Sequence, residues 1–291
     1  MIVVVGLHRT GTTFLQRLLA LDPAAMHIPL RRSLRPMTPP TRFGGLRDSL
    51  GLAVWRTLSP GVGEHHELGL DLPEEEGTLF AASFVAAHWI GPLPVPSYLR
   101  WMLRQDDAES YRTVRQWLQL YQAARPGEHW VLKSPFHLPS MASLLAQWPE
   151  ARVVFTHRDP ATATTSWCSY LEHLHGAVTR NPRRPDTAAA AITLARTGIE
   201  RTMAAREGAE DRFHDVHYAD LVRDPVGTVR AIHERFGLGW REPHEAAMVA
   251  SLARPRRPGG HRYRPEDYGT STAELQEQFS AYIRRFAIPL D

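Results

Sequence analysis

Short runs of apolar residues alternate along much of the chain with segments in which apolar residues recur every three to four positions. The runs are bounded by turn-forming residues and predict β-strands, whereas the segments with the longer period predict helices. We place strands at 2–7, 129–134, 151–157 and 213–218. Because predicted strands and helices alternate, we expect an α/β fold with a central parallel sheet flanked by helices.

Helices are predicted both after the first three strands and in the second half of the chain. Their expected ranges are 12–20, 138–147, 160–175, 187–207, 225–236, 243–253 and 272–285. Residues 24–127 are rich in Pro and Trp and carry no strand pattern, so we predict a helical insertion or cap within a single domain, 1–291. The basic stretch 179–186 is the best candidate for a mobile loop.

Composition narrows the class of protein. Hydrophobic residues make up 43% of the 291 positions, enough for a sizeable core. The apolar residues 1–7 are far too few to span a membrane, so we interpret them as a buried strand and expect no membrane association. A single cysteine, Cys168, excludes an internal disulfide, which fits a reducing cytoplasm or is neutral on the compartment. The formal charge of +3 favours anionic ligands mildly and is too small to indicate nucleic acid.

The kind of basic residue is more informative than the net charge. Lys133 is the only lysine, and every other basic residue is an arginine. Lysine and arginine replace one another readily on a solvated surface, but not where a compact point charge is needed. We therefore interpret Lys133 as a functional residue.

The first predicted strand leads into GLHRTGTT, which ends at Thr13. A strand, a glycine-bounded turn and a helix N-terminus direct backbone N–H groups at an anion, so this P-loop-like segment predicts a phosphate or sulfate site. Thr12 stands where a nucleotide triphosphatase has its lysine, and a cation comes earlier, at Arg9. No convincing Walker B carboxylate is present to hold magnesium. These departures disfavour a kinase or ATPase.

A second anion-binding pattern follows the strand ARVVFTH. Arg158 comes directly after it, and the pair from Asp159 to Pro160 opens a helix on which Ser166 can face the same edge of the sheet. An arginine and a hydroxyl form a charge-assisted clamp for a phosphate. Ser169 is a second hydroxyl nearby, of lower weight.

Several ordered motifs carry a family resemblance. These motifs are GLHRTGTTFLQRLLALDP, LKSP, THRDP, LPEEEGTLF and GGHRYRPEDYG. Through them the chain resembles the bacterial sulfotransferases that use 3′-phosphoadenosine 5′-phosphosulfate (PAPS). The resemblance implies an enzyme that moves a sulfuryl group from PAPS to a hydroxyl, or an amine, of a small-molecule acceptor and releases 3′-phosphoadenosine 5′-phosphate (PAP). It also implies that the insertion forms the acceptor side.

The resemblance assigns donor-binding roles to ten residues. It implies that the loop holds the phosphosulfate, that Arg158 and Ser166 hold the 3′-phosphate, that Tyr218 lies near the adenine, and that a C-terminal basic loop covers the 3′-phosphate or ribose. The residues concerned are Arg9, Thr10, Gly11, Thr12, Thr13, Arg158, Ser166, Tyr218, His261 and Arg262. Tyr263 and Tyr268 are expected to be packing residues.

Lys133 follows a predicted strand in VLKSP, where a side chain reaches the crevice at the carboxyl edge of the sheet. We expect it to donate a hydrogen bond to the bridging oxygen of the donor, with Arg9 and the loop amides sharing the developing charge. The sulfuryl group carries less charge than a phosphoryl group, so no metal is expected. The pair His65 and His66 has no third ligand at a suitable spacing.

The general base is left open by the sequence. Many relatives place a glutamate about two dozen residues after the loop, but here Arg31, Arg32 or Ser33 stands at that position. The remaining candidates are His27, His65, His66, Glu74, Glu75 and Glu76, and a histidine that precedes the PEE motif in the family matches His66 best.

Two other functions stay open at this point. A kinase-like P-loop enzyme is opposed by Thr12. A catalytically silent nucleotide-binding protein is compatible with the displaced base. Nothing in the sequence identifies the acceptor, although the Pro- and Trp-rich insertion predicts a partly apolar pocket.

Overall fold

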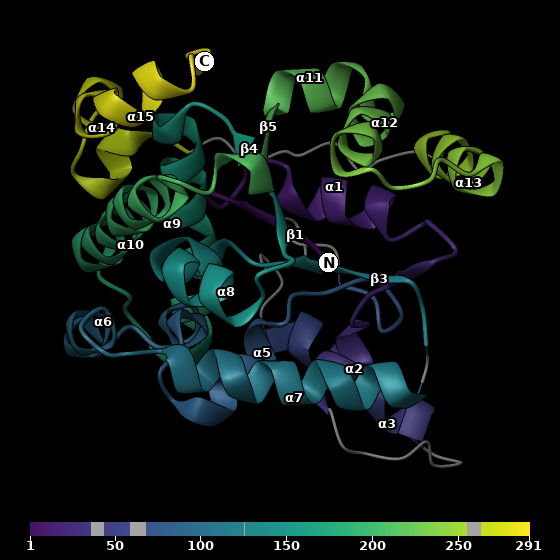
Figure 1. The fold of residues 1–291 in the computed structure, drawn as a ribbon. Helices are drawn as coiled ribbons and strands as arrows, with labels where there is room; N and C mark the ends of the chain where they lie inside the picture. Colours follow the sequence, from purple (N-terminus) through teal and green to yellow (C-terminus); the bar gives the residue numbers. More distant parts are fainter. Residues whose placement is uncertain (36–43, 59–67, 125, 255–262) are drawn as a thin grey trace.

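The computed structural model describes residues 1–35, 44–58, 68–124, 126–254 and 263–291 (Figure 1). Its centre is a parallel sheet with the strand order β2-β3-β1-β4-β5. The strands are β1 (Ile2–Gly6), β2 (Ala25–Met26), β3 (His129–Lys133), β4 (Arg152–His157) and β5 (Phe213–His217). Since β1 lies between β3 and β4, the segments that follow these three strands leave the sheet at the same carboxyl edge.

The α/β fold class predicted from the sequence is confirmed, with one addition to the sheet. The four predicted strands are present with ends that differ by at most one residue. The fifth strand, β2, lies within the stretch 24–127, which we expected to contain no strand. It pairs with β3 through Ala25 and Met26 alone, and two residues are too few to leave an alternating pattern in the sequence.

Alternating side chains of β1 enter two different cores. Val3 and Val5 pack in a cluster with α7, α8, α10 and α15, whereas Ile2 and Val4 pack in another with α1, α11, α12 and α13. Helices therefore cover both faces of the sheet (Figure 1). The helices named so far are α1 (Thr12–Leu19), α7 (Ala108–Ala124), α8 (Met141–Gln147), α10 (Arg184–Arg206), α11 (Tyr218–Arg223), α12 (Pro225–Phe236), α13 (Glu242–Leu252) and α15 (Ser280–Arg285).

The stretch between β2 and β3 is helical, as the sequence predicted. Among its described residues, the helices other than α7 are α2 (Leu30–Leu34), α3 (Gly44–Leu58), α5 (Gly77–Phe80) and α6 (Pro96–Met102), with short 3-10 turns η1 (Ala81–Ser83) and η2 (Ala87–Ile90). Among the residues that the structure describes, no helix is both long and apolar enough to cross a bilayer.

Four predicted helices differ by several residues in their limits. Residues 135–140 form the 3-10 helix η3 before α8, because Pro139 has no N–H to donate and disfavours α-helical backbone at the residue before it. The predicted helix 272–285 is divided at Phe279 into α14 (Thr272–Gln278) and α15. The helix α9 (Pro160–Val178) extends beyond residue 175, and α10 begins at Arg184, so much of the expected loop 179–186 is helix or its immediate approach. The remaining 3-10 turns are η4 (Glu210–Arg212) and η5 (Pro265–Tyr268).

A polar network that the sequence analysis missed holds the carboxyl end of β4. His157 is fully buried; its Nε2 donates to Asp215 Oδ1 over 2.9 Å, and its Nδ1 accepts from the Tyr282 hydroxyl over 2.9 Å. Asp215 on β5 also accepts two hydrogen bonds from Arg206, of 2.7 and 2.8 Å. The network joins β4, β5, α10 and α15. Its central residue, His157, directly precedes Arg158 in the sequence.

We expect Asp215→Asn to lower the free energy of unfolding by about 1–3 kcal/mol at pH 7, because it removes the charge that His157 and Arg206 face. Burial of its carboxyl raises the pKa of Asp215, but the hydrogen bonds and charges of His157 and Arg206 outweigh burial and hold that pKa far below its ordinary value. The carboxylate therefore stabilises the fold fully above about pH 4 and progressively less below it.

Urea unfolding of both proteins at several pH values measures this effect, and the gap between them should shrink as the pH falls below about 4. Asp220→Asn is the control, because the Asp220–Arg223 ion pair on α11 is exposed and should change stability by less than about 0.5 kcal/mol. A gap that stays constant with pH would contradict the proposed role of the Asp215 charge.

Candidate active site

The loop between β1 and α1 has the geometry of an anion site. Its backbone turns through two left-handed conformations, Arg9 with φ 71° and Gly11 with φ 89°. Gly11 is the N-cap of α1 and provides no side-chain hydrogen bond, so no capping side chain covers the first turn of the helix. Amides at such a helix start bind a phosphate or sulfate.

Two close approaches fix this loop against β4. A Cβ atom on Gly6 would lie 2.2 Å from Thr156 Oγ1 and 2.7 Å from the Thr156 carbonyl oxygen, so only glycine fits there. The Thr10 hydroxyl bonds to Thr156 Oγ1 over 2.6 Å and donates to the Leu7 carbonyl over 2.7 Å. Thr10 is fully buried. Its observed contacts hold the shape of the loop, whereas the sequence analysis assigned it to the ligand.

Arg9 connects the two predicted phosphate sites. Its Nε donates to the Ser166 hydroxyl over 3.2 Å, although the two residues are 157 positions apart. Ser166 lies on α9 and is fully buried, whereas Arg9 is exposed. The structure therefore brings Ser166 to Arg9, and no contact between Ser166 and Arg158 accompanies it among the described hydrogen bonds.

Tyr218 packs against the same loop, and Arg158 packs on Tyr218. The Arg158 guanidinium carbon is 4.5 Å from the centre of the Tyr218 ring, and the Arg158 Nε donates to Asp291 Oδ2 over 3.1 Å. A Cβ on Gly11 would lie 3.0 Å from the Tyr218 ring, so this ring packs directly against the start of α1. Of the predicted donor-binding residues outside the loop, Ser166 and Tyr218 thus contact it, and Arg158 packs on Tyr218.

Lys133, at the end of β3, is paired with a glutamate of the insertion. Its side chain is 1% exposed, and its Nζ donates to Glu75 Oε1 over 2.6 Å. Glu75 is 23% exposed, and its second oxygen accepts from the Ser134 hydroxyl over 3.3 Å. The pair places a buried cation and a partly solvated carboxylate side by side at the carboxyl edge of the sheet.

The next residue, Glu76, has a different environment. It is fully buried, accepts the backbone N–H of Lys133 over 3.1 Å and bonds to His137 Nε2. The Nδ1 of His137 bonds to the Tyr111 hydroxyl over 2.8 Å. Burial raises the pKa of Glu76, but the charge of His137 and the hydrogen bonds outweigh it and hold that pKa below its ordinary value. Glu76 therefore braces the end of β3.

His8, inside the loop, was missed by the sequence analysis. Its ring stacks on Trp167 with centres 3.8 Å apart and planes 5° apart. Burial, followed by the nearby charges of Lys133 and Arg9, holds the pKa of His8 well below its ordinary value, so the imidazole is neutral at pH 7. The only signal in the sequence was its place between Leu7 and Arg9, which does not separate a ligand contact from packing.

A small pocket lies between the insertion and the turn after β3. Its lining is mixed. Phe80, Met102 and Phe136 are among its apolar groups, and its polar groups are His88, Asp107, Tyr111, Ser134, His137 and Ser140. Burial lowers the pKa of His88, although the charges of Glu75 and Glu74 oppose that shift. His88 was also missed, because a lone histidine in an irregular stretch gives no pattern.

The structure describes some of the other residues named in the sequence analysis and leaves others undescribed. His27 follows the edge strand β2. Ser33 is buried on α2, and its hydroxyl donates to the Glu75 carbonyl over 3.2 Å. The position at which many relatives are expected to have a glutamate is thus in contact with the PEE segment, 73–75. Tyr268 is buried and donates to Glu172, in agreement with the expected packing role. His65, His66, His261 and Arg262 lie outside the described residues, and their roles stay predictions.

Comparison with known sequences relates this site to a family. A profile of the sulfotransferase family matches residues 2–242. Over 262 residues the chain is 25% identical to the omega-hydroxy-beta-dihydromenaquinone-9 sulfotransferase Stf3 of Mycobacterium bovis, and equally to the protein of the same name from Mycobacterium tuberculosis. The match covers 82% of this chain and 63% of each relative, so the chain spans less than two thirds of their length.

Two solved structures have the same fold over nearly the whole chain. Sulfotransferase STF1 from Mycobacterium tuberculosis is 32% identical with a TM-score of 0.79, covering 96% of this chain and 76% of that one. Sulfotransferase STF9 from Mycobacterium avium is 28% identical with a TM-score of 0.84, covering 99% of this chain and 77% of that one. The profile match spans most of the sequence, and these folds agree with it: the chain belongs to the sulfotransferase family.

Proposed function

We propose that this protein transfers a sulfuryl group from PAPS to a hydroxyl, or an amine, of an apolar small molecule and releases PAP. The observation that carries the proposal is the pair of the buried Lys133 and the partly exposed Glu75, whose charged atoms are 2.6 Å apart. A cation that faces the leaving group and a carboxylate that faces the acceptor are the two groups that this reaction needs.

The donor is proposed to lie across the carboxyl edge of the sheet. The loop amides and Arg9 would hold the 5′-phosphosulfate, since the first turn of α1 has no side-chain cap. Arg158 would hold the 3′-phosphate, with Tyr218 against the nucleoside. The Asp291 carboxylate, which now accepts from Arg158 over 3.1 Å, stands in for that phosphate. The bond between Arg9 and Ser166 would couple the two phosphate sites.

The proposed reaction is an in-line displacement at sulfur. The acceptor oxygen forms a bond to sulfur while the bond from sulfur to the bridging oxygen breaks, and its electron pair stays on the 5′-phosphate of PAP. Lys133 donates a hydrogen bond to that oxygen as charge develops there. The acceptor proton passes to Glu75, the less buried of the two carboxylates near Lys133.

Glu75 fits the role of base better than its neighbour. Both oxygens of Glu76 are occupied, one by the Lys133 backbone N–H and one by His137, in a site without exposure. Glu75 is 23% exposed, so an acceptor hydroxyl can reach it. The neutral imidazoles of His8 and His88 are the alternatives that the pH dependence of the rate must test.

The acceptor is proposed to enter the pocket beside Ser134. Its lining by Phe80, Met102 and Phe136 favours an apolar molecule whose hydroxyl points at Glu75. The relatives Stf3 are named for a hydroxylated menaquinone derivative, an apolar molecule of this kind. Screening apolar alcohols and amines with labelled PAPS tests the acceptor class. Magnesium-dependent turnover of ATP would instead support a kinase-like enzyme, and PAP binding without transfer to any acceptor would support a silent binding protein.

We expect PAP to raise the melting temperature more than ADP does, because ADP has no 3′-phosphate for Arg158. The shifts are measured at matched ligand concentrations, and Arg158→Ala should reduce the difference between the two ligands. Arg223→Ala, which removes an exposed arginine of α11 paired with Asp220, is the control. Equal shifts by PAP and ADP in the unsubstituted protein would contradict the 3′-phosphate site.

We expect Lys133→Ala to lower turnover about a hundredfold to a thousandfold while PAP binding changes much less, because the interaction is made mainly in the transition state. Lys133→Arg should restore activity only in part, since a planar fork cannot take the place of a compact ammonium. Transfer rates and PAP affinities are measured for both variants, with melting curves to confirm folding. Full activity in Lys133→Arg would refute this role.

We expect Glu75→Gln to lower turnover by a factor of about 100 to 10,000, because an amide cannot take up the acceptor proton. Glu76→Gln is the matched comparison: it should lower the melting temperature more than it lowers the rate measured on folded protein. The rate is followed from pH 5 to 9. If Glu75→Gln keeps the pH profile and rate of the unsubstituted enzyme, the base lies elsewhere, and His8→Gln and His88→Gln become the next variants.

A further inference from the structure

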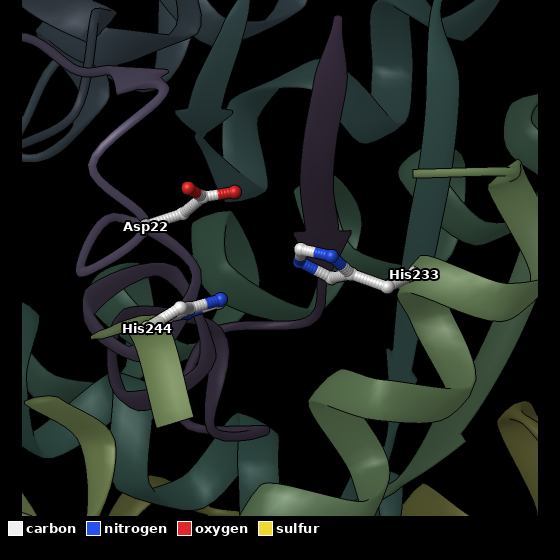
Figure 2. Close-up of side chains that lie close together, drawn as sticks. All are labelled: Asp22, His233 and His244. Carbon is white, nitrogen blue, oxygen red and sulfur yellow. The ribbon is translucent and has the colours of Figure 1, made fainter. Parts of the chain in front are cut away.

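Three ligand-type side chains converge at the opposite edge of the sheet from the loop. Asp22 follows α1, His233 lies on α12 and His244 on α13. Their side-chain ligand atoms all lie within 4.8 Å of one another, and they point toward a common space in Figure 2. All three are buried, with exposures of 3% for Asp22, 1% for His233 and 0% for His244.

In both histidines one ring nitrogen is hydrogen-bonded to a backbone carbonyl, and the other ring nitrogen keeps its lone pair for a ligand. The His244 Nε2 donates to the Leu18 carbonyl over 2.9 Å, and the His233 Nδ1 donates to the Gly239 carbonyl over 3.3 Å. Their other ring nitrogens, His244 Nδ1 and His233 Nε2, are buried and have no hydrogen-bond partner. A ring nitrogen fixed by a carbonyl, with its partner nitrogen turned to a shared centre, is the arrangement found at metal-binding histidines.

We propose that Asp22, His233 and His244 bind a structural zinc ion. Two imidazole nitrogens and a carboxylate oxygen are ligands that zinc accepts, with a fourth position left for another group. His129, at the start of β3, is a candidate for that position, because its Nε2 is also buried without a partner and it interacts electrostatically with Asp22 and His233. A water molecule is the other candidate.

The geometry requires a small closure around the ion. Ligand atoms of a tetrahedral zinc site are about 3.4 Å apart, given bonds of about 2.0–2.1 Å. The separations of up to 4.8 Å therefore have to shorten by as much as roughly 1.4 Å. Small side-chain rotations that keep the two carbonyl hydrogen bonds can supply this, because no hydrogen bond among the described residues joins the free ring nitrogens to another ligand atom.

The charges around the cluster are compatible with a cation. Asp22 and Glu128 are negative, and Arg241 lies between them, 2.6 Å from Glu128 but 3.4 Å from each Asp22 oxygen. The long contacts to Asp22 and the short one to Glu128 indicate that Arg241 is held mainly by Glu128. The Asp22 carboxylate accepts one good hydrogen bond, from the Ala24 N–H over 2.9 Å, and retains lone pairs for an ion.

The ion would join the end of α1 to the consecutive helices α12 and α13, which are distant from it in sequence. Asp22 ends the region of α1, whereas His233 and His244 lie more than 200 positions later, and the His244 bond to Leu18 already touches the last turn of α1. A crosslink over so long a loop restricts the unfolded chain strongly. We therefore expect zinc to stabilise the fold, and it has no role in the sulfuryl transfer proposed above.

The experiment uses the full chain without a polyhistidine tag, stripped with a chelator and then given zinc chloride. Three readouts are zinc content after gel filtration, zinc affinity in competition with a chromophoric chelator, and melting temperature. Cobalt chloride provides a fourth, since cobalt in a tetrahedral site of this kind absorbs visible light. None of them depends on catalysis, so they remain valid whether or not the proposed function holds.

The unsubstituted protein should keep about one zinc per chain and melt several degrees higher with zinc than without it. Asp22→Asn and His233→Asn should bind zinc at least about tenfold more weakly and lose the zinc-dependent shift. His129→Asn tests the fourth ligand: weaker binding assigns it to His129, and unchanged binding assigns it to water. His214→Asn, a partly buried histidine of β5 outside the cluster, is the control.

Circular dichroism checks that each variant folds, and Asp22→Asn is the decisive one because it keeps the side-chain shape. The proposal is overturned if the unsubstituted protein retains no zinc and shows no zinc-dependent melting shift. It is equally overturned if folded Asp22→Asn and His233→Asn bind zinc as the unsubstituted protein does, or if His214→Asn loses as much zinc as they do.

Discussion

The ammonium of Lys133 lies where water is almost wholly excluded, and a charge in such a place requires an opposite charge and hydrogen bonds. Its partner, Glu75, comes from the insertion, 58 residues earlier in the chain. The next residue, Glu76, binds the Lys133 backbone N–H and His137, so consecutive carboxylates attach the insertion both to the strand end and to the turn after it. The cation at the sheet edge and the wall of the neighbouring pocket are therefore positioned by the same contacts.

The shape of the anion loop depends on a steric constraint rather than on charge. Gly6 has no room for a side chain against Thr156, and the Thr10 hydroxyl closes the gap between the two strands. Within the loop held in this way, Arg9 and Gly11 have left-handed backbone, and Gly11 leads directly into α1. The Thr10 hydroxyl thus serves the shape of the loop, whereas the binding roles of Arg9, Thr12 and Thr13 stay predictions.

Much of this arrangement could be predicted because its signals are local. The strand runs, the glycine-bounded loop and the Asp-Pro helix start each depend on neighbouring residues, and the structure places them within a few positions of the prediction. Other features depend on pairings that no local pattern reveals. The contact between Arg9 and Ser166 spans 157 positions, the His157–Tyr282 bond spans 125, and β2 is a strand only because β3 lies beside it. His8 and His88 were missed because burial and neighbouring charge, not their spacing, make them neutral imidazoles.

Helix α1 connects the carboxyl edge of the sheet to the opposite edge. Its first turn begins at the anion loop, where Gly11 packs against Tyr218, and its last turn offers the Leu18 carbonyl to His244. Between these ends, Leu15, Leu18 and Leu19 pack into the core formed with β1, α12 and α13. An eight-residue helix has little stability of its own, so its position is set by these contacts. Because the amides of the loop lead into the start of this helix, the contacts at its far end, including the hydrogen bond from His244, also fix the direction of those amides.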